Sequence, residues 1–143
     1  MKEIVLRYFF EGHATAQELA RDVADARVAP EAPGFRSSAN YRVLPMARTF
    51  AVTPDHIIRL VDAALAGELS LDDLGVIVFC LEAWPDRWEW DTDTPEGERV
   101  AEALFWLGTP EINYPLTSAV LGKIRHYLAT GENTLSDADV RAL

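Results

Sequence analysis

One stretch of the sequence decides the fold class: residues 71–84, which read L-D-D-L-G-V-I-V-F-C-L-E-A-W. Its apolar residues fall on every side of a helix, and a helix that is apolar all round is buried. Ser70 with Asp73 three residues later is a typical helix start, and Pro85 ends the run. We therefore expect the central helix of a helical bundle. Phe79 would be a core residue of that helix, so we expect Phe79→Ala to lower the free energy of unfolding by several kcal/mol.

Three Thr-Pro-acid sequences mark further helix starts, at Thr53, Thr94 and Thr109. Each supplies a cap residue, a proline at the first helical position and an acid at the positive end of the helix dipole. The first two open apolar stripes of helical period that end at glycines. The third is interrupted by Asn-Tyr-Pro at 113–115, so it predicts only a turn.

Both ends of the chain carry further helical signals. Residues 2–11 are apolar on almost every side, which predicts a short helix, although a buried strand fits nearly as well. Thr15 begins a capping-box pattern that opens a second helix, to about residue 27. Residues 117–130 predict a sixth helix, and residues 136–139 predict a marginal turn or two.

Residues 28–52 have no helical period and contain prolines and a glycine, so they predict a long irregular loop. Between Arg27 and Arg59, five arginines stand against two acids, and we expect this segment to wrap the bundle and pair with acidic helices. Its apolar anchors, in a short extended piece, would be Tyr41, Val43, Phe50 and Val52.

The length and composition of the chain limit the fold classes and the classes of partner that are compatible with it. A chain of 143 residues with 49% hydrophobic and 25% charged residues is an ordinary globular domain. We expect an all-α, single-domain bundle of five to six helices over residues 1–143. The formal net charge of -10 repels phosphate backbones, so it argues against nucleic-acid binding and favours a basic protein partner.

The cysteine content and the start of the chain bear on the compartment. Cys80 is the only cysteine and cannot form an internal disulfide, which fits a reducing compartment. Residues 1–7 contain an acid and two bases around an apolar stretch that is too short for a signal peptide or a membrane span. We therefore expect a cytoplasmic protein that does not associate with membranes.

The acids near Thr94 invite a calcium interpretation, which fails on detail. Asp91, Asp93 and Glu102 fall at positions one, three and twelve of a calcium-loop frame. However, Pro95 occupies a position where a ligand is needed, and Gly97 comes one residue late for the sharp turn. A helix first turn explains the acids of this region, so we predict no metal site and no cofactor.

No constellation of residues predicts catalysis. Cys80 lies in an apolar run, where its thiol is expected to be a core group, and the three histidines are far apart in the sequence without ligand spacing. We therefore predict no catalytic residue and no enzyme. The alternative is an enzyme site walled by Arg36, Arg42, Asp91 and His126, which has no spacing in its favour.

Residues 82–102 concentrate the unusual composition of the chain, with eight acids against two arginines and three of the four tryptophans. Trp88 and Trp90 follow Pro85 in a non-helical stretch and alternate with acids, a composition typical of binding hot spots. The alternative is that both rings fold back over the core and leave only the acids outside. We predict a partner-binding surface formed by Asp86, Trp88, Glu89, Trp90, Asp91 and Asp93.

In size, acidity and helical build, the chain resembles the acidic immunity proteins that neutralise bacterial toxins. The resemblance is one of overall plan; it implies an inhibitor that docks on a basic partner protein and carries over no site residue. A second hypothesis is a self-associating structural or regulatory subunit. In that case the basic segment 27–59 of one copy would meet the acidic segment 82–102 of the next.

Overall fold

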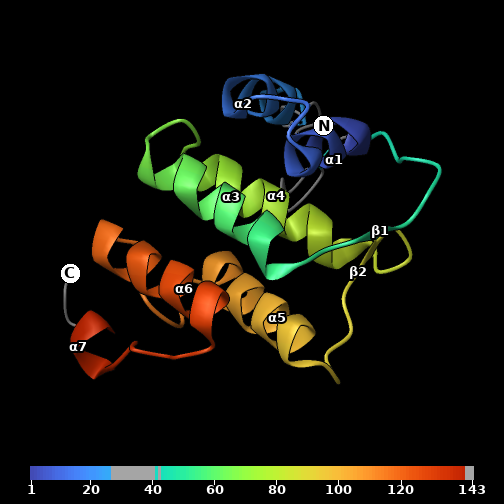
Figure 1. Ribbon diagram of the computed structural model, residues 1–143. Helices are drawn as coiled ribbons and strands as arrows, with labels where there is room; N and C mark the ends of the chain where they lie inside the picture. The colour runs from blue at the N-terminus through green and yellow to red at the C-terminus, as the bar shows by residue number, and fades with distance from the viewer. Residues whose placement is uncertain (27–40, 42, 141–143) are drawn as a thin grey trace, which may run out of the picture.

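The computed structural model describes residues 1–26, 41 and 43–140 (Figure 1). That part of the chain is mainly helical, as predicted, with seven helices and one two-stranded parallel ladder. None of its helices is long and apolar enough to cross a membrane. The elements are α1 (Glu3–Glu11), α2 (Ala16–Ala24), β1 (Phe50–Ala51), α3 (Pro54–Leu65), α4 (Leu71–Ala83), β2 (Trp88–Glu89), α5 (Pro95–Gly108), α6 (Ser118–Thr130) and α7 (Asp137–Val140).

The helix starts follow the cap chemistry that the sequence predicts. Thr15 forms a reciprocal capping box, because its hydroxyl accepts the N–H of Glu18 while the Glu18 carboxylate accepts the N–H of Thr15. The hydroxyls of Ser70, Thr94 and Thr117 each accept an N–H three residues on. The Thr109 sequence starts no helix, as expected, and Thr109 instead follows the end of α5.

Thr53 caps α3 as predicted, and the cap has one further contact that the sequence did not indicate. Pro54 stands at the first helical position as predicted, but the Thr53 N–H is bonded by the imidazole Nδ1 of His56 at 2.9 Å. Because Nδ1 accepts this bond, the imidazole carries its proton on Nε2. His56 therefore has a structural role at the helix start that its spacing in the sequence did not indicate.

The helices pair in three layers, with α1 and α2 on one side, α3 and α4 in the middle, and α5 and α6 on the other side (Figure 1). The middle pair touches both outer pairs, since α2 packs on α4, α6 on α3, and α5 on both. The stretch predicted at residues 2–11 forms a helix, α1, over Glu3–Glu11, and not a buried strand. The core is one continuous cluster that draws on all six of these helices.

One prediction for α4 is wrong. Leu74, Ile77 and Leu81 are fully buried, but Phe79 is 40% exposed and Leu71 is 48% exposed. The reason is that, within the described residues, α4 packs against α2, α3 and α5 on part of its circumference, and no described helix covers the face with Leu71 and Phe79. Phe79→Ala is therefore not a core truncation.

The irregular loop predicted at 28–52 lies partly outside the described residues, at 28–40 and 42. Its described end is extended, as expected. Phe50 and Ala51 pair in parallel with Trp88 and Glu89, and Val52 is buried. A second contact, an isolated parallel bridge, joins Lys2 to Leu44. The acidic segment after α4 is thus held by a strand pairing that the sequence alone did not indicate.

Candidate protein-binding surface

Trp88 belongs to the core and not to the predicted surface. Its side chain is 1% exposed and lies edge-on to the rings of Phe10 and Phe50, with centroid distances of 5.9 and 5.8 Å. The indole N–H donates to Glu3 Oε2 at 2.9 Å. For Trp88 the alternative expectation holds, in which the ring folds back over the core.

A buried carboxylate holds this arrangement. Glu3 has no exposed surface, and its Oε1 accepts hydrogen bonds from the Arg87 guanidinium and from the backbone N–H of Met46, the latter at 2.9 Å. A buried carboxylate is tolerated only when it is paired and fully hydrogen-bonded, and here each oxygen has a donor. Since Glu3 and Trp88 lie 85 residues apart, no local pattern could have indicated the contact.

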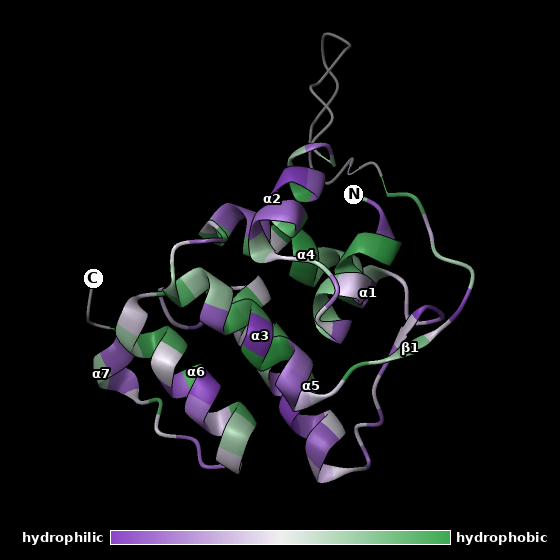
Figure 2. Ribbon diagram, turned by 45° about the horizontal axis from the view of Figure 1, so that its top comes forward, coloured by the Kyte–Doolittle hydropathy of each residue, from purple (hydrophilic) through white to green (hydrophobic). Residues whose placement is uncertain are grey.

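The neighbouring residues of the predicted surface lie outside the core. Asp86, Glu89, Asp91 and Asp93 are exposed, and Trp90 is half-buried against the core cluster. Figure 2 shows that hydrophilic residues continue from this segment into the N-terminal half of α5. The structure therefore separates Trp88 from the five other residues of the predicted surface.

Hydrogen bonds within the segment fix its path. Asp91 Oδ1 accepts the N–H of Asp93 at 2.9 Å, and the Asp91 carbonyl accepts the Thr94 hydroxyl at 2.7 Å. These contacts form a short turn of the kind that Asp commonly makes. The Asp86 carboxylate lies 3.7 Å from the Arg87 guanidinium.

Gly97 lets this turn sit on the start of α5. A Cβ built on Gly97 would lie 1.7 Å from the carbonyl oxygen of Asp91, a distance that no side chain can occupy. Only glycine allows such a close approach of two backbone segments. This packing accounts for the glycine that comes one residue late for a calcium loop.

A hollow of about 360 Å³ opens where the segment meets β1 and α5. Trp90 contributes its aromatic surface, and three acids stand in the lining: Glu89, Asp91 and Glu96. The described lining contains no Lys, Arg or His. The carboxylates of Glu89 and Glu96 make no hydrogen bond or ion pair with any described residue. An aromatic face beside unpaired carboxylates can bind a cationic side chain.

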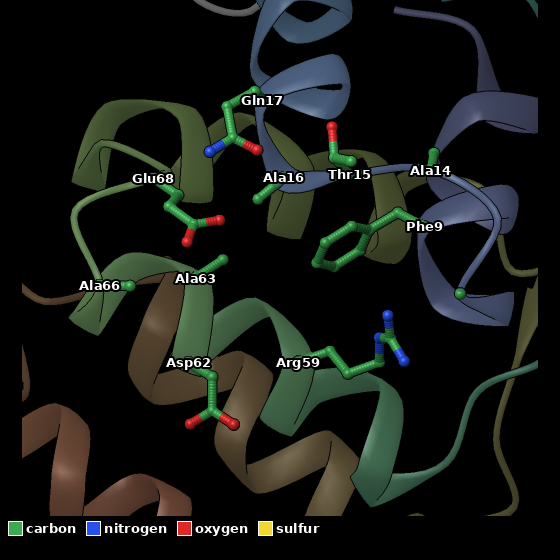
Figure 3. A pocket seen from close by; sticks show the side chains of 11 residues that line it. Phe9, Ala14, Thr15, Ala16, Gln17, Arg59, Asp62, Ala63, Ala66 and Glu68 are labelled. Atoms are coloured by element: carbon green, nitrogen blue, oxygen red, sulfur yellow. The ribbon is translucent and has the colours of Figure 1, made fainter.

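A second hollow, of about 620 Å³, lies between α1, α2 and α3 (Figure 3). The Arg59 guanidinium lies over the Phe9 ring, 5.5 Å from its centroid, and Figure 3 shows Gln17 and Glu68 on the opposite side. Asp62 is paired with Arg125, whose Nε lies 2.6 Å from Oδ1. The described lining holds no Cys, Ser or His. Its Thr15 hydroxyl caps α2 and donates to the Glu18 carboxylate at 3.2 Å.

The other candidate residues that the structure describes make separate contacts. Cys80 is fully buried, and burial raises the pKa of its thiol to about 11, which suits an inert core group as predicted. His126 Nε2 lies 3.9 Å from Glu132 Oε2, whereas the carboxylate of Asp91 bonds within its own turn. Arg36 and Arg42 fall outside the described residues. Within the described part of the chain, no three His, Cys, Asp or Glu residues are placed to hold a metal ion.

Comparison of the chain with known protein families, with curated proteins and with solved structures found no match.

Proposed function

We propose that this chain is a small acidic protein-binding domain that docks on a basic partner protein through the Trp90 hollow. The observation that supports the proposal is the half-buried Trp90 ring flanked by acids, with no cation in the described lining. Asp86 and Asp93 are exposed on the same segment and extend its negative charge. Trp88 takes no part, since it is enclosed in the core.

The chemistry of the hollow selects a lysine or arginine side chain. A cation over a tryptophan face contributes about 0.5 to 2 kcal/mol, depending on how far it is desolvated. The surrounding carboxylates would attract the partner over a distance and speed its association. Exposed ion pairs contribute only about 0 to 1 kcal/mol each, so the acids serve rate and specificity more than affinity.

A narrower form of the proposal is an immunity-type inhibitor in the bacterial cytoplasm. The acidity and small helical build that support this form are those of the resemblance drawn from the sequence. The domain would then inhibit a basic toxin by binding it. Loss of the captured partner's activity on addition of one equivalent of the domain would distinguish inhibition from simple binding.

The second candidate is a self-associating subunit without catalytic activity. The exposed side chain of Arg48 favours it, because its guanidinium pairs with no acid among the described residues and could meet the acidic segment of another copy. Such an assembly would grow with protein concentration and dissociate in salt. Size-exclusion chromatography at low and high salt separates this candidate from the first.

The test is affinity capture from the source cells with three tagged proteins. These are the wild type, a hollow variant with Glu89→Lys and Glu96→Lys, and a control with Glu68→Lys and Glu132→Lys. All four glutamates are exposed, and both variants change the net charge equally. Far-UV circular dichroism first establishes that each variant keeps its helices.

We expect one basic protein, identified by mass spectrometry, to be held by the wild type and the control and lost by the hollow variant. Equal recovery from all three proteins would show that the hollow is not the docking site. Recovery of the chain alone, in a salt-sensitive complex, would favour the self-associating subunit.

A further inference from the structure

The outer face of α4 borders a groove that is separate from the Trp90 hollow. Two hollows of about 450 and 350 Å³ lie between α4 and the residues that follow α5, and both are lined by Gly75, Phe79 and Gly108. Because they share these residues, they form one continuous groove. The Trp90 hollow lies at the N-terminal end of α5 and this groove at its C-terminal end, about 20 Å away along a 14-residue helix.

The side of the groove formed by α4 carries an apolar stripe. Leu71, Gly75 and Phe79 follow one another at intervals of four residues, so they lie on one face of the helix. Both large side chains remain substantially exposed, although the Tyr41 ring touches Phe79 at a centroid distance of 5.2 Å. Pro110 and Leu116 supply apolar surface on the other side. Exposed apolar surface gathered in a groove is typical of an interaction site.

Gly75 keeps the groove open. A glycine inside a helix lowers helix stability relative to alanine, so its presence needs a reason. Close packing among the described residues does not supply one, because a Cβ on Gly75 would meet no described atom outside the local backbone of α4 within 4 Å. The residue has an ordinary helical conformation and not a positive φ. A larger residue at position 75 would fill the space in the groove.

The charged residues around the groove are all acidic within the described lining: Asp72, Glu82 and Glu111. The Glu82 carboxylate makes no ion pair or hydrogen bond with a described residue. Burial raises the pKa of Glu82, because it removes hydration that favours the charged carboxylate. A cation brought by a partner would favour the charged form.

We propose that the α4 groove binds an amphipathic helix of a partner protein, with apolar residues against Leu71 and Phe79 and Lys or Arg residues against the acids. The distance along α4 from Leu71 to Phe79 is about 12 Å, or two helical turns. That length accommodates apolar anchors at positions i, i+4 and i+7 of a bound helix. The charge of the groove excludes a helix with acidic flanks and selects one with basic flanks.

Two glycines provide a matched test. Gly75→Gln fills the groove, whereas Gly122→Gln makes the same change inside α6, where a Cβ also meets nothing within 4 Å. Both variants should unfold at higher temperature than the wild type, because Gln forms helix better than Gly. Loss of binding by Gly75→Gln alone therefore cannot be attributed to a damaged fold.

The probe is a displayed library of helical peptides about four turns long, with Leu fixed at positions i, i+4 and i+7 and the other positions randomised. Selection on the wild type, with Gly75→Gln as the counter-selection target, should enrich peptides with Lys and Arg at the flanks. Enriched peptides should bind Gly75→Gln at least about ten-fold more weakly and bind Gly122→Gln unchanged.

Three results would overturn the proposal. The first is that no peptide is enriched on the wild type relative to Gly75→Gln. The second is that the enriched peptides have neutral or acidic flanks. The third is dimerisation of the wild type that Gly75→Gln abolishes and Gly122→Gln does not, which would place a second copy of the chain in the groove.

Discussion

Trp88 and Trp90 stand two residues apart in the same acidic segment, yet the fold uses them differently. Trp88 is enclosed by Phe10 and Phe50 and donates its indole N–H to Glu3, while Trp90 lines an open hollow beside acids. The difference lies in what each ring meets across the chain and not in its neighbours along it. One short segment therefore both attaches to the core and presents a surface.

The largest expected effect tests this contrast directly. Trp88→Ala should lower the free energy of unfolding by about 3 to 5 kcal/mol, because it empties a core site and removes a donor from the buried Glu3 carboxylate. Trp90→Ala should lower the free energy of unfolding by only about 1 kcal/mol, since the Trp90 ring is half-buried. Urea unfolding of both variants measures the difference. Equal costs would mean that the two rings are equivalent and that the contrast is wrong.

Helix α4 shows the same contrast between neighbours, with a smaller expected difference. Ile77→Ala should cost about 2 to 5 kcal/mol because Ile77 is fully buried. Phe79→Ala should cost about 1 kcal/mol or less, because that ring is partly exposed and rests mainly on Tyr41. Thermal unfolding of the two variants gives the comparison. A large cost for Phe79→Ala would show that another part of the chain covers the outer face of α4.

The smallest effect concerns His56, which packs against the same Phe10 and Phe50 rings as Trp88. Burial, the largest influence, lowers the pKa of His56 below its ordinary value of 6.5. The unfolded chain then binds a proton that the folded chain resists, so stability is complete above pH 6.5 and is lost as the pH falls below it.

His56→Gln isolates this contribution, since Gln can still accept the Thr53 N–H at the start of α3. We expect the wild type to lose stability more steeply than His56→Gln between pH 7 and the lower pKa of His56, as measured by urea unfolding. Parallel curves for the wild type and His56→Gln would show that His56 carries no pH-dependent stability.

The features that could be predicted from the sequence are those formed by residues close together in the chain. Thr15, Ser70, Thr94 and Thr117 mark helix starts because each cap joins groups only three residues apart. The interrupted sequence after Thr109 was interpreted correctly for the same reason.

What the sequence missed depends on distant contacts. The burial of Trp88 follows from Glu3 and from the pairing of Phe50 with Trp88, which join residues far apart in the chain. The exposure of Phe79 depends on which faces of α4 are covered by other elements, and an apolar run in the sequence does not show this. The acids of the predicted surface are exposed and Trp90 is half-buried. Acids in a loop stay in contact with water even where neighbouring residues of the segment pack on the core.

The most direct measurement follows the tryptophan indole N–H signals by NMR as the captured basic partner is added. We expect the Trp90 signal to shift in proportion to the bound fraction and the Trp88 signal, whose ring is enclosed against Glu3, to stay in place. The Trp90 and Trp88 signals are assigned from Trp90→Phe and Trp88→Phe, each of which lacks one of the four signals. A Trp90 signal that stays unchanged at saturation would contradict the claim that the Trp90 hollow is where the partner binds.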